Sequence, residues 1–316
     1  MASLNSPLTF EPIFQERIWG GRKLAERFGK NIPPNKRIGE SWEIVDRPEA
    51  QSIVREGPLS DRSLHDLWVN FREELFGEIP DAPRFPLLIK LLDAHERLSL
   101  QVHPPQEIAE SLGGEAKNEF WYVAAAEPNA EIFVGLRKSM TRDQFEDALH
   151  SGTVADCVHA IQMKSGAAMF LPSGRFHAIG AGNLLVEVQQ NSDTTYRVFD
   201  WNRVDDQGKP RQLHVNQALQ CIDFNDVAPK LIEPRGELLT RHQFFEVQKW
   251  NLVSPRDIAP IGQFAIVLCL TGELQYGGVD FTPGDFFLVP ASLQHRSIYP
   301  WDKGTSLLRI TIPAFD

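Results

Sequence analysis

A twelve-residue pattern occurs twice in this chain and constrains its fold more than any other feature. Residues 166–177 read GAAMFLPSGRFH and residues 284–295 read GDFFLVPASLQH, so the two copies align without a gap. In each copy, glycine suits the turn that opens a strand, and apolar residues alternate along that strand. Proline then stands where the strand ends and no amide donor is needed. The pattern predicts that the closing histidine, His177 or His295, begins the next strand.

Short strands dominate the rest of the sequence as well. Segments with β-type patterning, bounded by glycine, proline, asparagine or aspartate, favour strands at Leu87–Leu92, Ser99–His103, Glu119–Ala124, Ile132–Gly135, Ala168–Pro172, Leu184–Gln189 and Ala265–Leu270. The repeated pattern is that of the second half of a double-stranded β-helix. Two copies therefore predict two cupin-type jelly-roll units.

Helical signals are few. Ser63–Gly77 carries leucines and aromatic residues at helical spacing and ends at a glycine. Arg142–His150 follows Thr141, which forms a capping-box pattern with Gln144. We therefore predict a mainly β fold of two jelly-roll units with a few peripheral helices.

The boundary between the units is expected near Ile232–Glu237, where Pro234 and Gly236 interrupt the strand pattern. Residues 1–231 would form a catalytic, metal-binding cupin domain with helical elaborations. Residues 232–316 would form a cupin-like domain without metal, because the segment before the second repeat offers His295 no histidine or carboxylate partner. We expect His295 to be structural.

Charge and apolar patterning exclude several classes of protein. The net charge of −10 and the isoelectric point near 5.4 argue against a nucleic acid or an anionic membrane as partner. A local pair of cations could still hold a small anionic substrate. Met1–Pro12 lacks the pattern of a secretory signal, and the longest apolar run, Phe264–Leu270, is too short to span a bilayer. We expect a cytoplasmic protein.

Residues of metal-binding type recur on predicted strands. Ser99, Gln101 and His103 project to one face of their strand by alternation, Glu119 opens another strand, and His177 comes from the repeat. Two imidazoles, one carboxylate and one amide oxygen suit Zn²⁺, with one ion per chain. Two histidines and a glutamate also fit ferrous iron or manganese. Taken alone, each of these residues would more often be structural than a metal ligand.

A second group of polar residues could act on a substrate. Glu187 lies on a predicted strand, the polar loop after it contains Asp193 and ends at Arg197, and Lys117 precedes the candidate carboxylate ligand by two residues. Aldose–ketose isomerisation removes a weakly acidic proton beside a carbonyl. It needs a Lewis acid, a base, and cations for the phosphate and the enediolate. The ordinary alternative is that these are exposed carboxylates and a surface ion pair.

At these residues the chain resembles the short, bacterial-type mannose-6-phosphate isomerases, the type I phosphomannose isomerases, over nearly its whole length. The resemblance is carried by the runs Arg17–Gly21 (RIWGG), Ile38–Glu43 (IGESWE), Pro86–Ala94 (PLLIKLLDA), Leu98–Pro104 (LSLQVHP), Phe170–Gly180 (FLPSGRFHAIG) and Gln189–Arg197 (QQNSDTTYR). The fourth and sixth runs are the most specific. There are two departures: Asn118 stands where the family has a small residue or proline, and Ile179 stands where longer members have tyrosine. Asn118 is expected to face away from the metal.

The resemblance implies roles for individual residues. The implied zinc ligands are Gln101, His103, Glu119 and His177, although short members may use only the two histidines and the glutamate. The implied residues that contact the substrate are Ser99, Lys117 and Arg197. Arg197 would also stabilise charge on the intermediate, and Lys117 would help to offset that charge. Glu187 and Asp193 are the candidates for the acid–base residue.

The function expected from these residues is the interconversion of D-mannose 6-phosphate and D-fructose 6-phosphate through a cis-enediol intermediate. Its partner would be a phosphorylated hexose, with no nucleic acid and no membrane, and the chain would be a monomer or a homodimer. Two alternatives stay open. One is a non-catalytic cupin that binds a sugar phosphate, and the other is a cupin oxygenase or isomerase with another substrate.

Overall fold

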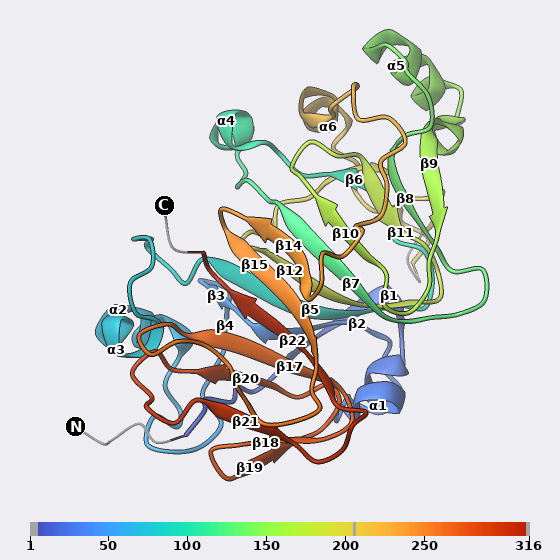
Figure 1. Cartoon of the computed structure of the whole chain (residues 1–316). Coiled ribbons are helices and arrows are strands. Elements are labelled where there is room, and N and C mark those ends of the chain that lie inside the picture. The colour runs from blue at the N-terminus through green and yellow to red at the C-terminus, as the bar shows by residue number, and fades with distance from the viewer. Residues whose placement is uncertain (1–5, 205–206, 314–316) are drawn as a thin grey trace.

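The computed structural model describes residues 6–204 and 207–313, and it shows β-sheets running through the molecule with helices at the periphery (Figure 1). The prediction of a mainly β fold is confirmed. Residues 1–5, part of the segment considered for a secretory signal, lie outside the described residues.

Two antiparallel sheets form the N-terminal unit. The larger sheet has the strand order β1-β2-β5-β12-β7-β10. Its strands are β1 (Ile13–Gly21), β2 (Ile38–Ile44), β5 (Leu87–Ala94), β7 (Glu119–Ala126), β10 (Ala168–Leu171) and β12 (Asn183–Gln190). The smaller sheet, in the order β13-β6-β11-β8-β9, consists of β6 (Leu100–Val102), β8 (Glu131–Leu136), β9 (Val158–Gln162), β11 (His177–Ile179) and β13 (Tyr196–Phe199). The six strands predicted here are confirmed, with ends within two residues.

Strand β5 lies inside the larger sheet and positions part of the candidate site. All eight of its residues are buried, and its sequence LLIKLLDA is apolar apart from Lys90 and Asp93. It pairs with β2 on one side and with β12 on the other, so that Lys90 lies opposite both Trp42 and Glu187. The fold thereby brings a lysine and a glutamate together in the interior.

The C-terminal unit also consists of two sheets, in the orders β14-β15-β22-β17-β20 and β16-β21-β18-β19. Their strands are β14 (Leu238–His242), β15 (Phe245–Asn251), β16 (Arg256–Asp257), β17 (Ala265–Thr271), β18 (Leu274–Tyr276), β19 (Val279–Phe281), β20 (Phe286–Val289), β21 (Ser297–Pro300) and β22 (Ser306–Thr311). A two-stranded ribbon of β3 (Asp46–Arg47) and β4 (Ala50–Gln51) completes the strands. The sheets remain separate and do not close into barrels.

Both expected helical regions are helical, but one is interrupted. Helix α5 (Arg142–His150) has the capping box of Thr141 and Gln144, as predicted. The segment Ser63–Gly77 forms two helices, α2 (Leu64–Asn70) and α3 (Arg72–Phe76), because Phe71 leaves the helical conformation at φ −133°. Three further α-helices in the described part of the chain were not predicted: α1 (Lys23–Phe28), α4 (Gln106–Ala109) and α6 (Val215–Cys221).

The two copies of the repeat differ at the histidine. Strand β11 begins at His177, as predicted, whereas β21 begins at Ser297, so the prediction for His295 is wrong. His295 is exposed, and the next residue, Arg296, is buried instead. Its guanidinium donates to the carbonyl oxygens of Ala259 and Pro290, which draws that side chain inward and leaves His295 in the loop.

One apolar core extends across both units. Trp68, Phe76 and Phe85 come from the first unit and pack with Phe264 of the second, whose ring centroid is 5.7 Å from that of Phe76 and 6.1 Å from that of Phe85. The division into residues 1–231 and 232–316 stays a prediction. Because the core is shared, we propose that the two units unfold together.

Replacing Phe264 by alanine is expected to lower the free energy of unfolding by about 3–5 kcal/mol, the usual cost of deleting a buried aromatic ring. Urea unfolding followed by both circular dichroism and tryptophan fluorescence should give one coincident transition, in the variant as in the parent protein. Two separate transitions in the parent protein would contradict joint unfolding.

Candidate active site

Three side chains of metal-binding type meet between the two sheets of the first unit. His103 follows β6, Glu119 opens β7, His177 opens β11, and all three are buried. Their ligand atoms lie within 4.8 Å of one another. Nε2 of His103 is 3.1 Å from Oε1 of Glu119, and Nε2 of His177 is 3.7 Å from Oε2. The fold thus brings together three ligand types that are far apart in sequence.

Both imidazoles are held in the orientation that metal binding requires. Nδ1 of His103 lies 2.8 Å from the carbonyl oxygen of Thr194, and Nδ1 of His177 lies 2.8 Å from that of Arg175. A carbonyl can only accept, so each Nδ1 carries the proton and each Nε2 keeps its lone pair. Burial lowers the pKa of His103, and it lowers the pKa of His177 to about 3. Both rings are therefore neutral at pH 7.

The polar atoms between these side chains fit a cation. Nε2 of His103 and both carboxylate oxygens of Glu119 are buried and form no hydrogen bond of ordinary geometry, although Lys117 Nζ is 2.8 Å from Oε1. Burial alone would raise the pKa of Glu119, but the Lys117 ammonium together with the neighbouring His103 and His177 keeps that pKa well below its usual range. Buried polar atoms rarely lack partners without a reason. Two neutral nitrogens and a carboxylate can hold a divalent metal ion.

Gln101 borders the three ligands. It lies opposite His177 where β6 pairs with β11, and its amide nitrogen is 3.3 Å from His177 Nε2. A half-turn of the amide exchanges its nitrogen and oxygen, so either atom can face the ligands. On the other side, the amide oxygen is 3.4 Å from the hydroxyl of Ser99.

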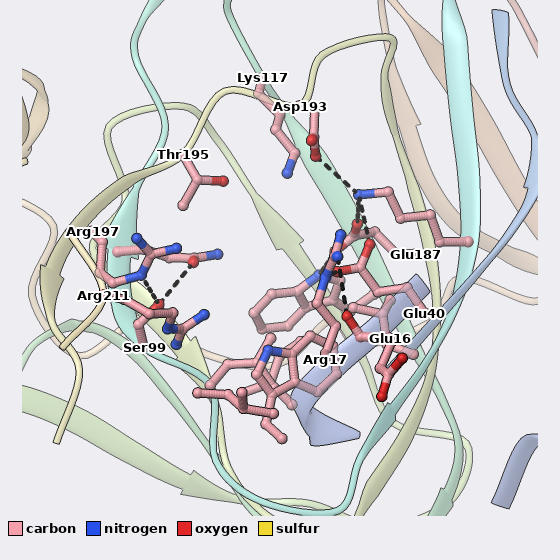
Figure 2. Close-up of a pocket in the computed structure, with 18 residues that line it drawn as sticks. Glu16, Arg17, Glu40, Ser99, Lys117, Glu187, Asp193, Thr195, Arg197 and Arg211 are labelled. Carbon is pink, nitrogen blue, oxygen red and sulfur yellow. Dashed lines mark hydrogen bonds and ion pairs between the residues drawn. The ribbon is translucent and has the colours of Figure 1, made fainter. Parts of the chain in front are cut away.

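A cavity of about 460 Å³ opens beside the metal-binding residues and is bordered by Gln101 and Lys117. Figure 2 shows Ser99, Thr195, Arg197 and Arg211 on one side of this cavity, with Glu40 and Glu187 on the opposite side and Lys117 and Asp193 between them. The cavity is thus lined mainly by charged and polar side chains, which suits a polar substrate.

Glu187 is the most enclosed carboxylate of the cavity wall and is 4% exposed. Its Oε2 accepts a hydrogen bond of 2.9 Å from Trp121 Nε1, and its Oε1 lies 3.3 Å from Lys90 Nζ. Burial raises the pKa of Glu187, and the negative charge of Glu119 raises it further. A carboxyl group fixed at two oxygens, with a raised pKa, is suited to moving a proton.

The remaining predicted residues line the same cavity. Asp193 is partly exposed, and its Oδ1 lies 3.9 Å from Lys90 Nζ. Arg197 donates from Nε to the Ser99 hydroxyl at 3.2 Å. Asn118 faces away from the metal-binding residues, as expected, since its amide donates to Gln190 at 2.7 Å. The sequence-based candidates thus form a single site.

Known proteins resemble this chain along its length. The family model described as the catalytic domain of type I phosphomannose isomerase matches residues 8–145. The chain is 37% identical to the probable mannose-6-phosphate isomerase GmuF of Bacillus subtilis, over 98% of this chain and 100% of that protein. It is 36% identical to the mannose-6-phosphate isomerase ManA of the same organism, over 91% and 94%. The chain belongs to the type I phosphomannose isomerases.

The fold of this member of the type I phosphomannose isomerases agrees with a crystal structure. The mannose 6-phosphate isomerase from Bacillus subtilis superimposes with a TM-score of 0.86 at 34% identity, covering 97% of this chain and 100% of that one. The expectation of a cupin-type fold is confirmed.

Several cavity residues of this type I phosphomannose isomerase escaped the sequence analysis: Arg17, Glu40, Lys90, Trp121 and Arg211. Lys90 could have been noticed in the sequence, because it is the one basic residue of β5 and the other residues of that strand, except Asp93, are apolar. Nothing in the sequence singles out Arg211, because it lies in the loop after β13, and arginine is common in exposed loops.

No helix in the described part of this family member is long and apolar enough to cross a membrane.

Proposed function

We propose that this chain is an aldose–ketose isomerase that interconverts D-mannose 6-phosphate and D-fructose 6-phosphate. The observation that carries the proposal is the buried group His103, Glu119 and His177 beside a cavity whose wall holds Glu187. Membership of the family and the names of its relatives support the same reaction. We propose a cytoplasmic enzyme, as a monomer or a homodimer.

We propose Zn²⁺ as the resident metal, one per chain. His103, Glu119 and His177 would hold it, and Gln101 would contribute its amide oxygen when that atom faces the ligands. Nitrogen and oxygen donors suit zinc, and with the two histidines and the glutamate as its only protein ligands the ion would keep a coordination position for the substrate. When bound, such an ion polarises the oxygen atoms at C1 and C2 of the sugar.

The side chains of the cavity wall provide the rest of the chemistry. Glu187 takes the proton from one of the two reacting carbons and returns it to the other, while Trp121 and Lys90 hold its carboxylate in place. Asp193 is the second candidate for this transfer. Lys117 and Arg197 offset the negative charge of the phosphate and of the enediolate, and Ser99 positions Arg197.

Two alternatives have less support. A non-catalytic cupin that binds a sugar phosphate would not explain why Glu187, a buried carboxyl group with a raised pKa, lies beside the metal-binding residues. A cupin oxygenase, or an isomerase with another substrate, would explain the metal-binding residues but not the names of the relatives.

A coupled assay tests the proposal. Purified protein with zinc is expected to form fructose 6-phosphate from mannose 6-phosphate, to lose this activity after dialysis against a chelator, and to regain it when zinc is added back. The same series with manganese or ferrous iron identifies the preferred metal. A protein that binds mannose 6-phosphate but forms no product with any of these metals would be the non-catalytic cupin.

A further inference from the structure

Two arginines pair with a single carboxylate next to the cavity, and a third arginine lies near them. Arg211 forms a two-point ion pair with Asp200, in which Nε is 2.7 Å from Oδ2 and Nη2 is 2.6 Å from Oδ1. Arg203 donates to the same carboxylate. Arg197 stands on the same side of the cavity, and no carboxylate in the described part of the chain pairs with it. Among the residues that the structure describes, Asp200 is thus the one carboxylate paired within this group of three arginines, in a chain whose net charge is −10.

The electrostatics of the cluster agree with this imbalance. Burial lowers the pKa of Arg197, and the positive charge of Arg211 lowers it further. Burial would raise the pKa of Asp200, but the hydrogen bonds from Arg211 and Arg203 outweigh it, so the pKa of Asp200 is lowered. Asp200 is thus ionised at neutral pH, and it fixes the position of Arg211.

Both cavity arginines keep donors for a ligand. Asp200 occupies Nε and Nη2 of Arg211, and Nη1 has no hydrogen-bond partner among the described residues. Arg197 donates from Nε to Ser99 and from Nη1 to the carbonyl oxygen of Gln212 at 2.8 Å, which leaves Nη2. Figure 2 shows both arginines on one side of the cavity, with the Thr195 hydroxyl nearby. Guanidinium N–H groups match phosphate oxygens in geometry and charge.

Two side chains, Gln101 and Ser99, stand between Arg197 of this cluster and the metal-binding residues. Ser99 and Gln101 are two residues apart in sequence, and the Ser99 hydroxyl lies 3.4 Å from the amide oxygen of Gln101. Gln101 borders the metal-binding residues, whereas Ser99 accepts from Arg197. In a hexose 6-phosphate the phosphate is attached to C6 and the reacting carbons are C1 and C2. The anionic group and the reacting carbons are therefore at opposite ends of the substrate, just as Arg197 and His177 stand at the two ends of this row of contacts.

We propose that Arg211 binds the phosphate group of the substrate and makes the enzyme selective for phosphorylated over free sugars. Arg197 completes the subsite, and Asp200 is the positioning residue that aims Arg211 at the phosphate. This inference rests on the proposed function, because it takes a hexose 6-phosphate as the substrate.

The test compares Arg211→Ala with the parent protein in two measurements. In the isomerase assay, KM for mannose 6-phosphate is expected to rise roughly 10- to 100-fold, the effect of losing a charge-assisted hydrogen bond, with little change in kcat. In calorimetric titrations with inorganic phosphate, the dissociation constant should rise by a similar factor. Arg211→Lys keeps the charge with a single donor group and should show smaller rises, so the test holds even where Arg211→Ala fails to fold.

Arg256→Ala is the matched control. Arg256 forms a comparable two-point pair with Glu237, at 2.7 and 3.0 Å, but lies in the second unit away from the cavity. Its loss should leave both measurements unchanged. Unchanged KM and phosphate affinity in Arg211→Ala would overturn the proposal, and so would a fall in kcat at constant KM. If the parent protein binds phosphate through Arg211 but shows no isomerase activity, the proposed function fails while the anion subsite stands.

Discussion

Replacing His177 by alanine is expected to lower kcat/KM for mannose 6-phosphate by more than about 1,000-fold and to abolish metal binding. Losing a residue that merely orients a metal ligand costs roughly 10- to 100-fold, so losing one of three direct ligands should cost more. Nε2 of His177 is unprotonated and lies 3.7 Å from Oε2 of Glu119, so the variant removes one of the three proposed ligand atoms. Metal content by atomic spectroscopy should fall from about one ion per chain to near zero.

The chain contains a matched control for this variant. His295 occupies the same position in the second copy of the repeat, is exposed, and lies outside the cavity, so His295→Ala should keep both metal and activity. Circular dichroism should show that both variants are folded. Full activity with a normal metal content in His177→Ala would show that His177 is not a metal ligand and would overturn its assignment.

Replacing Glu187 by glutamine is expected to reduce kcat by roughly 100- to 10,000-fold, the range attributed to general acid–base catalysis. KM should change little. Glutamine keeps the volume of the side chain, and its amide oxygen can still accept the hydrogen bond from Trp121 Nε1. What it loses is the ability to take up and release the proton. Exchange of the substrate C2 hydrogen with deuterium from the solvent, followed by NMR, should slow by the same factor.

The variant Asp193→Asn distinguishes between Asp193 and Glu187 as the residue that transfers the proton. Asp193 is more exposed than Glu187 and its one ion-pair contact is 3.9 Å long, so this variant should lose less activity and keep the exchange reaction. If Asp193→Asn stopped the exchange while Glu187→Gln continued it, the proton transfer would belong to Asp193.

Much of the first unit could be predicted because its strands have local signals. The repeat sets the turn, the strand and the following histidine, and Leu184–Gln189 and Leu87–Leu92 are apolar enough to be recognised as buried strands. The break at Phe71 was missed because Ser63–Gly77 keeps helical spacing on both sides of it. Whether such a helix continues is decided by packing rather than by spacing.

The candidate site was predictable where its residues lie on alternating strands. The alternation of side chains along a strand was enough to place Ser99, Gln101 and His103 on one face. The same alternation predicted that Asn118 faces away from the metal-binding residues. Lys90 was not assigned a role because its surroundings depend on the pairing of β5 with β2 and β12. Strand order and register between distant segments are not visible in the residues of one strand.

The failed expectation for His295 has a definite cause. The repeat predicts backbone geometry, but the side chain that turns inward depends on what fills the space. Arg296 satisfies several backbone carbonyls at once, and a buried guanidinium with that many acceptors outweighs the pattern seen in the first copy.

The imidazole rings of His103 and His177 are both oriented by main-chain oxygens, those of residues 194 and 175. Every amino acid carries such an oxygen, so these two positions can change their side chains through evolution without disturbing the ring tautomers. The orientation of the two rings should therefore not restrict which amino acids occur at positions 194 and 175. Insertions or deletions that shift the backbone there should be selected against. The backbone conformation at these two positions, rather than the identity of their side chains, thus sets the orientation of the two histidine rings.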